Sequence, residues 1–128
     1  MVDQRQEANK ATVLAFYEKI VNQRDFDGAS YYVGSYYKQH RADVADGLDG
    51  LGDFMERSKR TNPDLHADIK RVLADGDFVV LHSHVTRSRG DRGSKHVDIF
   101  RLEDGKLVEH WDIDQPIAET SVNSNGPF

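Results

Sequence analysis

Hydrophobic positions recur at two different periods along this chain, and the period changes near residue 65. In residues 4–22 they return every three or four positions, which predicts one amphipathic helix. A cap at Asp25 or Asp27 predicts a short second helix that Gly34 stops, and apolar positions in residues 48–59 predict a third helix. The first half of the chain is therefore expected to be mainly helical.

Segments from residue 65 onward alternate between apolar and polar residues, which is typical of β-strands. Residues 65–73, 78–86, 95–102 and 107–114 predict four strands in meander order. Helices followed by an antiparallel sheet indicate an α+β fold, and a sheet covered by helices on one face can curl and enclose a pocket. We expect residues 1–128 to form a single domain, with residues 120–128 as a flexible tail.

The last two predicted strands carry polar side chains on the face that would normally pack against the core. A three-residue loop between these strands would place Asp98 opposite His110 and His96 opposite Asp112, all on one face. A two-residue turn would instead place Asp98 beside Trp111. The first register gathers the charged residues on the opposite face and creates an acid/base cluster, but the sequence leaves both registers open.

The amino-acid composition of the chain limits the kinds of molecule that it is expected to bind. The chain has 17 basic and 22 acidic residues, a net charge of -5, and no cluster of lysine and arginine along one face, so nucleic acid is not an expected partner. It has no cysteine, which excludes disulfides, thiolate metal sites and cysteine nucleophiles. No apolar segment approaches membrane-spanning length and the N-terminus is polar, so we expect a cytoplasmic protein with no membrane partner.

Six short motifs follow one another along the chain: Phe16-Tyr17, Tyr37-Lys38-Gln39-His40, Asp75-Gly76-Asp77, Val97-Asp98-Ile99-Phe100-Arg101, Glu109-His110-Trp111-Asp112 and Gln115-Pro116-Ile117. Their order and spacing resemble the SnoaL-like polyketide cyclase family, which shares a superfamily with nuclear transport factor 2, ketosteroid isomerase and scytalone dehydratase. The resemblance covers nearly the whole chain. It implies a cone-shaped, curved antiparallel or mixed sheet wrapped by three N-terminal helices around an apolar pocket. The chain departs from the family pattern at Arg41-Ala42, where the family has Asn-Pro.

Four residues are candidates for catalysis. Asp98 stands among apolar neighbours, and a buried carboxylate in an apolar pocket is suited to general acid/base chemistry, although a structural ion pair would explain it equally well. His110 would be oriented by Asp98, and Asp112 is the alternative base. The resemblance implies that His40 points into the mouth of the cavity.

The residues expected to bind substrate are aromatic or basic. Tyr17 could donate its hydroxyl to a substrate carbonyl, although a tyrosine in a helical apolar stripe is often a core residue. A symmetric loop at residues 88–94 would place His84 across from Asp98, and the His82 and His84 pair has a spacing that metal sites use. We expect no metal and no cofactor, because the chain lacks thiolates and the family needs none. The expected substrate-binding set is Tyr17, Tyr37, Phe54, His82, His84 and Phe100.

These residues predict an enzyme that transfers protons on a small apolar carbonyl compound, by aldol cyclisation, isomerisation or dehydration. The alternative is a binding domain that sequesters a small hydrophobic ligand without catalysis. Trp111, Val97 and Ile99 share the opposite face of the predicted hairpin. An apolar outer face on so small a chain predicts a homodimer through the sheet, which the family resemblance also implies.

Overall fold

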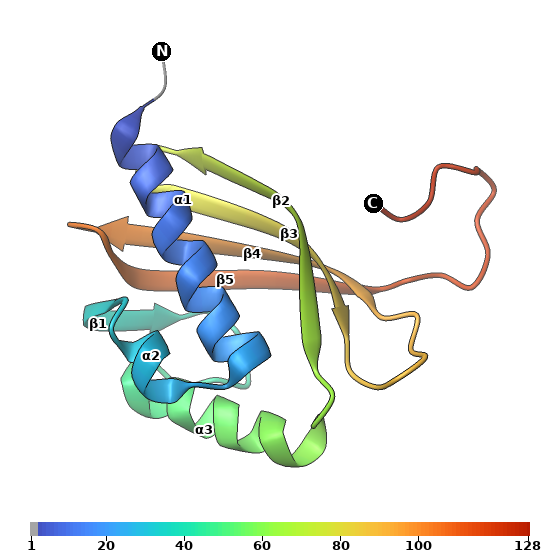
Figure 1. Cartoon of the computed structure of the whole chain (residues 1–128), viewed down its shortest axis with the longest axis horizontal. Coiled ribbons are helices and arrows are strands. Elements are labelled where there is room, and N and C mark those ends of the chain that lie inside the picture. Colours follow the sequence, from blue (N-terminus) through green and yellow to red (C-terminus); the bar gives the residue numbers. More distant parts are fainter. Residues whose placement is uncertain (1–2) are drawn as a thin grey trace.

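The computed structural model describes residues 3–128 and confirms the α+β class. Helices cover one face of a curved, mixed sheet of five strands in this part of the chain, and α1 runs obliquely across that face (Figure 1). The elements are α1 (Gln4–Tyr17), the π-helical turn η1 (Glu18–Gln23), α2 (Phe26–Ser30), β1 (Val33–Gln39), α3 (Gly47–Thr61), β2 (His66–Asp75), β3 (Phe78–Thr86), β4 (Ser94–Glu103) and β5 (Lys106–Pro116). No helix among residues 3–128 is both long and apolar enough to cross a bilayer.

The first helix forms as predicted and supplies one wall of the core. Asp3 caps it, because its side chain accepts from the backbone N–H groups of Arg5 and Gln6 at 2.9 and 3.2 Å. The helix continues through η1 and ends at Arg24, which has a φ of 54°. Its buried side chains, which pack on the sheet and on the neighbouring helices, are Val13, Phe16, Tyr17, Ile20 and Val21.

Strand β1 was not expected from the sequence. The second helix ends at Ser30 rather than at Gly34, and Gly34 lies inside β1, so the predicted helix stop is wrong. This strand pairs in parallel with β5 at the edge of the sheet, which has the order β1-β5-β4-β3-β2. A Cβ at Gly34 would lie 2.9 Å from the Val108 side chain, so a glycine is required for the close approach of the two strands.

The hairpin between β4 and β5 has a register that neither prediction describes. Asp104 and Gly105 form a two-residue turn with φ values of 49° and 76°, and a bulge follows at Val108. The bulge shifts the pairing by one residue, so Asp98 pairs with Asp112 rather than with His110 or Trp111. In the first predicted register Asp98 pairs with His110, and the observed partner, Asp112, lies two residues further along β5. Because side chains two residues apart on a strand share a face, the polar residues still lie on the predicted face.

Residues along β4 alternate strictly between the covered face and the outer face of the sheet. Along β4 the buried residues are Ser94, His96, Asp98, Phe100 and Leu102, and the residues between them are more exposed. Four of the six histidines lie outside this buried face, and only His96 and His110 lie within it. The core thus contains a small group of ionisable residues, and the fold positions the helices directly over them.

Candidate active site

A cavity of about 60 Å³ lies between the helices and the covered face of β1, β4 and β5. Seven of the predicted site residues line it: Tyr17, Tyr37, Phe54, Asp98, Phe100, His110 and Asp112. Its remaining walls combine apolar side chains from α1 and α3 with polar ones from the sheet and the β1–α3 connection, namely Phe16, Ile20, Val21, Val44, Leu51, Gln39, Arg41 and His96. The cavity therefore joins an apolar enclosure to a cluster of polar and charged groups.

Asp98 and His110 form a hydrogen-bonded pair at the base of the cavity. The distance from His110 Nε2 to Asp98 Oδ1 is 2.7 Å, and His110 Nδ1 lies 2.7 Å from Oε1 of Gln39. The backbone N–H groups of His40 and Arg41 also donate to Oε1 of Gln39, both at 3.1 Å, so His110 Nδ1 and two backbone nitrogens converge on this amide oxygen. Gln39 thereby fixes the orientation of the imidazole ring toward Asp98.

The second oxygen of Asp98 is left without a hydrogen-bond partner among residues 3–128. Oδ2 is fully buried, and the residue is only 2% exposed. Burial disfavours the carboxylate, but hydrogen bonds from His110 and His96 outweigh this effect and hold the pKa of Asp98 well below its usual range. Asp98 is thus a carboxylate with one oxygen fixed by hydrogen bonds and one oxygen free.

His96 lies among three carboxylates. Its Nδ1 is 2.8 Å from Oδ1 of Asp114, and its Nε2 is 3.4 Å from both Asp98 Oδ1 and Asp112 Oδ2. Burial disfavours the imidazolium, but the carboxylates of Asp112 and Asp98 outweigh it and raise the pKa of His96 to about 10. His96 therefore carries a positive charge beside Asp98 at neutral pH.

Asp112 lies across the hairpin from Asp98 and is held by a guanidinium group. Arg41 Nη1 donates to Oδ2 of Asp112 at 3.2 Å, and the same guanidinium donates to Asp43 and stacks over the ring of Phe54 at 5.3 Å. The Asp98 side chain is 3% exposed, whereas the side chains of Asp112 and Arg41 are 11% and 33% exposed. Asp112 thus holds Arg41 in the more exposed part of the cavity wall.

Two tyrosines line the cavity. Tyr17 comes from α1 and Tyr37 from β1, and both are almost completely buried. Burial and the negative charge of Asp98 raise the pKa of each phenol well above its usual value, so both keep their protons at neutral pH. Ser83 faces the same region from β3, and its buried hydroxyl has no partner among residues 3–128. The cavity therefore offers neutral hydroxyl donors near Asp98.

Three predicted site residues lie outside the cavity. The prediction that His40 points into its mouth is wrong: the ring stacks on Trp111, with centroids 4.7 Å apart, and its Nε2 is 2.7 Å from Oε2 of Glu109. Both of these residues belong to the outer face of β5. His40 is therefore an outer-face residue.

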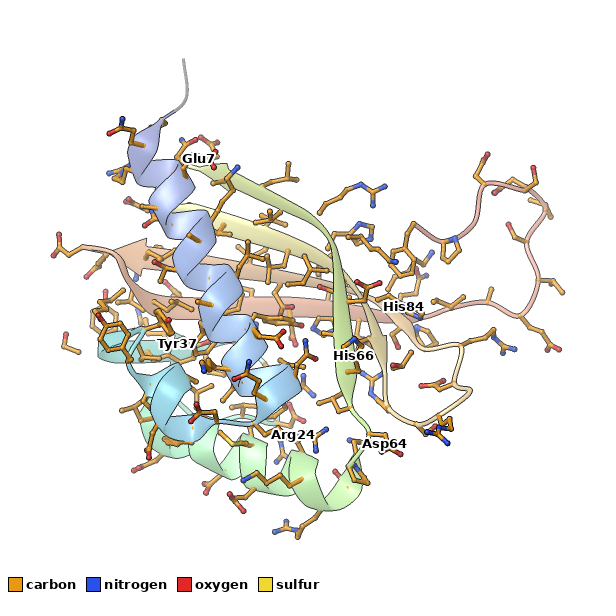
Figure 2. All side chains as sticks on the ribbon, viewed as in Figure 1. Glu7, Arg24, Tyr37, Asp64, His66 and His84 are labelled. Atoms are coloured by element: carbon orange, nitrogen blue, oxygen red, sulfur yellow. The ribbon has the colours of Figure 1, made fainter. Side chains whose placement is uncertain are left out.

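His82 and His84 also lie on the outer face, so their predicted placement in the pocket is wrong. His84 pairs with Lys95 rather than facing Asp98, because Leu81 is the cross-strand partner of Asp98. In Figure 2 His84 lies near the far end of β3, well away from Tyr37 beside α1. Both imidazoles pack near the ring of Phe128, with centroid distances of 5.3 and 5.2 Å.

Gln39 and Arg41 are site residues that the sequence analysis did not select. Gln39 was missed because β1 was not predicted, so nothing placed it next to His110. The signal for Arg41 was its departure from the family motif, where an arginine replaces an asparagine. The physical clue in that replacement was the positive charge of Arg41, because carboxylates were predicted to face the same pocket.

His96, Asp98 and Asp112 are close enough together to hold a metal ion, since their ligand atoms lie within 4.8 Å of one another. The chemistry of this group does not favour one. A metal ligand must be a neutral imidazole, whereas His96 is protonated with a pKa of about 10, and Arg41 already binds Asp112. Residues 3–128 therefore fit a charged hydrogen-bonded cluster better than a metal centre.

Comparisons with known proteins agree with the fold. The family model described as SnoaL-like polyketide cyclase matches residues 11–119. No curated protein matches the sequence at a significant level.

Solved structures share the fold at low sequence identity. A candidate polyketide cyclase from Bacillus cereus is 19% identical with a TM-score of 0.75, over 89% of this chain and 78% of that one. An NTF-2 like protein from Burkholderia xenovorans is 15% identical with a TM-score of 0.72, over 94% and 92%. IdmH from Streptomyces antibioticus, also described as a candidate polyketide cyclase, is 19% identical with a TM-score of 0.66, over 83% and 91%. The match over most of its length shows that this chain belongs to the SnoaL-like polyketide cyclase family.

Proposed function

We propose that this protein is an enzyme that transfers protons on a small apolar carbonyl compound, with Asp98 as the general base. The observation that carries this proposal is the unpartnered Oδ2 of Asp98, buried at the wall of the cavity. A buried acceptor without a partner costs stability, so its presence calls for a role that a fully satisfied ion pair would not have. Accepting a proton from a bound molecule is such a role.

The chemistry follows from the groups around the cavity. Asp98 Oδ2 takes a proton from the carbon next to the substrate carbonyl, and the electrons of that C–H bond form an enolate. The Tyr17 hydroxyl donates a hydrogen bond to the enolate oxygen, and the positive charge of His96 stabilises it. The enolate then attacks a second carbonyl of the same molecule, takes the proton back at another carbon, or expels a hydroxide from the next carbon. These steps correspond to cyclisation, isomerisation and dehydration.

The low pKa of Asp98 sets a requirement on this mechanism. It keeps the carboxylate ionised at every working pH, but it also makes the carboxylate a weak base. Most of the stabilisation must therefore come from groups that act on the enolate, which here are a buried phenol and a buried imidazolium. Tyr17 and His96 both retain their protons at neutral pH and can supply it.

Deuterium uptake tests the proposal without knowledge of the natural substrate. The protein is incubated with acetophenone in heavy water, and exchange at the carbon next to the carbonyl is followed by NMR. We expect exchange above the buffer rate, its loss in Asp98→Asn, and its retention in Asp68→Asn, which changes an exposed carboxylate on β2 paired with Lys70. Binding of acetophenone without exchange would contradict the enzyme and support the alternative of a binding domain.

We also propose that two copies associate through the outer face of the sheet. Trp111, Val97 and Ile99 lie on that face, and Ile113 beside them is 67% exposed. Phe78 also approaches the Trp111 ring, with centroids 6.1 Å apart. A contiguous apolar patch of this kind is typical of a protein interface.

A further inference from the structure

A second cavity adjoins the one that contains Asp98. Its volume is about 150 Å³, and it shares five lining residues with the first cavity. These shared residues are Tyr17, Val21, Arg41, Phe54 and His96. A bound molecule can therefore extend from the Asp98 region into this second space without leaving the protein.

Basic side chains predominate in the lining of the second cavity. Four basic residues line it, Arg41, Arg57, Arg87 and the protonated His96, and, of the residues that the structure describes, Asp43 is the one acidic residue in the lining. Asp98, Asp112 and Asp114 contact Arg41, Arg87 or His96 from outside this lining. The chain carries a net charge of -5. Among residues 3–128 the guanidinium groups of Arg57 and Arg87 each contact only one acidic residue, so their remaining N–H groups can bind an anionic group.

Hydrogen-bond donors remain available in this cavity. Arg57 uses only Nη2, which donates to Asp43, and Arg87 uses Nη1 and Nη2, which donate to Ser94 and Asp114. Arg57 Nε and Nη1 and Arg87 Nε therefore have no partner among residues 3–128. The hydroxyl of Ser58 is buried on the wall of the cavity and also has no partner in this part of the chain. An unsatisfied buried hydroxyl next to free guanidinium donors points to a ligand that completes the set.

We propose that the substrate of this site carries a carboxylate, which binds in the second cavity, in addition to the carbonyl that reacts beside Asp98. The planar guanidinium of Arg57 donates to the carboxylate, Ser58 adds a hydroxyl donor, and Arg41 and Arg87 supply positive charge. This inference rests on the proposed function, because it assigns the substrate class of the same site. The carboxylate anchors the molecule and places its carbonyl against Asp98 and Tyr17.

A matched pair of ketones tests this inference. Levulinic acid and methyl levulinate have the same ketone, but only the first carries a negative charge. Calorimetric titration should show that the acid binds at least about tenfold more tightly than the ester, as expected for charge-assisted hydrogen bonds. Arg57→Gln and Ser58→Ala should each reduce this preference. Lys59→Gln, which removes a positive charge from the same helix outside the cavity, should leave it unchanged.

The outcomes separate the two proposals. Equal affinity for acid and ester, no binding of the acid at millimolar concentration, or a preference that survives Arg57→Gln would overturn the carboxylate site. Deuterium exchange on methyl levulinate without any preference for the acid would leave the proposed function standing and this inference rejected. A preference for the acid without exchange on either ketone would support the carboxylate site and reject the proposed proton transfer.

Discussion

Two histidine–carboxylate pairs with the same hydrogen-bond length lie on opposite faces of one sheet. His110 and Asp98 are 2.7 Å apart on the covered face, and His40 and Glu109 are 2.7 Å apart on the outer face. The outer pair is satisfied and open to water: Glu109 Oε1 accepts from Arg101 at 2.8 Å, and the His40 side chain is 44% exposed. The inner pair is buried and leaves Asp98 Oδ2 unpartnered.

The comparison shows that distance alone does not define a reactive pair. Both faces supply an imidazole and a carboxylate, but only the covered face encloses them and leaves an acceptor free beside a cavity. Water and salt screen the electrostatic interaction of the outer pair, whereas the low dielectric constant of the protein interior strengthens each electrostatic interaction there. The same two residue types therefore serve different purposes, and burial and satisfaction of hydrogen bonds decide between them.

Replacing the two histidines separately is the strongest test of this difference. His110→Gln removes the donor that fixes Asp98 Oδ1, and we expect exchange on acetophenone to fall by about 10²-fold. His40→Gln should change the rate by less than about twofold, because that pair does not reach the cavity. Exchange rates measured at one pH for both variants and the wild type check the expectation, and equal losses in the two variants would remove the distinction.

The pH profile of His110→Gln separates positioning from a purely structural role. The hydrogen bond from His110 helps to hold the pKa of Asp98 below its usual range, so its loss should raise that pKa. Exchange requires the carboxylate form, and the acidic limb of the rate profile should therefore move to higher pH. An unchanged limb with a lower plateau would mean that His110 does not act through Asp98.

Stability at alkaline pH tests the charged environment of the inner face. The imidazole of His96 has a pKa of about 10 in the folded protein, against an ordinary value of 6.5. The folded state retains a proton that the unfolded chain loses, so the contribution of His96 to the free energy of unfolding is fully present below pH 6.5 and falls as the pH rises toward 10. Urea denaturation across this range should show a loss of a few kcal/mol in the wild type. His96→Gln should remove most of this dependence, and His84→Gln on the outer face should retain it.

The alternation of the strands was predictable, and it explains how much of the site could be found from sequence. Apolar residues at every second position assigned His96, Asp98, His110 and Asp112 to the covered face, which the structure confirms. The register was not predictable, because the bulge at Val108 adds one residue that hydrophobic pattern does not reveal. Relative to the first predicted register, the observed pairing is moved by two residues, which changes the cross-strand partners but leaves each side chain on its predicted face.

The errors have equally specific causes. His82 and His84 share a face with each other, but Val79, Leu81 and Val85 occupy the other parity and are the core residues of β3. That apolar series was the signal that the histidines face outward. Strand β1 was missed because its partner β5 lies about seventy residues away along the chain, and a parallel edge strand depends on such non-local pairing.

An acidic residue on the outer face tests whether that face is an interface. Trp111→Glu would place an unpaired charge at the centre of the proposed contact, at a cost on the order of 2 kcal/mol. We expect the wild type to scatter light as a dimer at micromolar concentration and the variant to shift toward monomer. Exchange on acetophenone within each subunit should remain measurable, since Trp111 does not line the cavity. A wild type that is monomeric at this concentration would reject the proposed dimer.

The smallest expected effect concerns the turn that aligns the two faces. Asp104 adopts a φ of 49° and precedes Gly105 at 76°, a conformation in which asparagine is favoured over aspartate. Asp104→Asn should therefore raise the free energy of unfolding by about 0.5 kcal/mol without changing the register. Asp77→Asn is the matched control, because the turn between β2 and β3 has its positive φ at Gly76 and none at Asp77. Equal gains in the two variants would assign the effect to the loss of a negative charge rather than to the backbone of the β4–β5 turn.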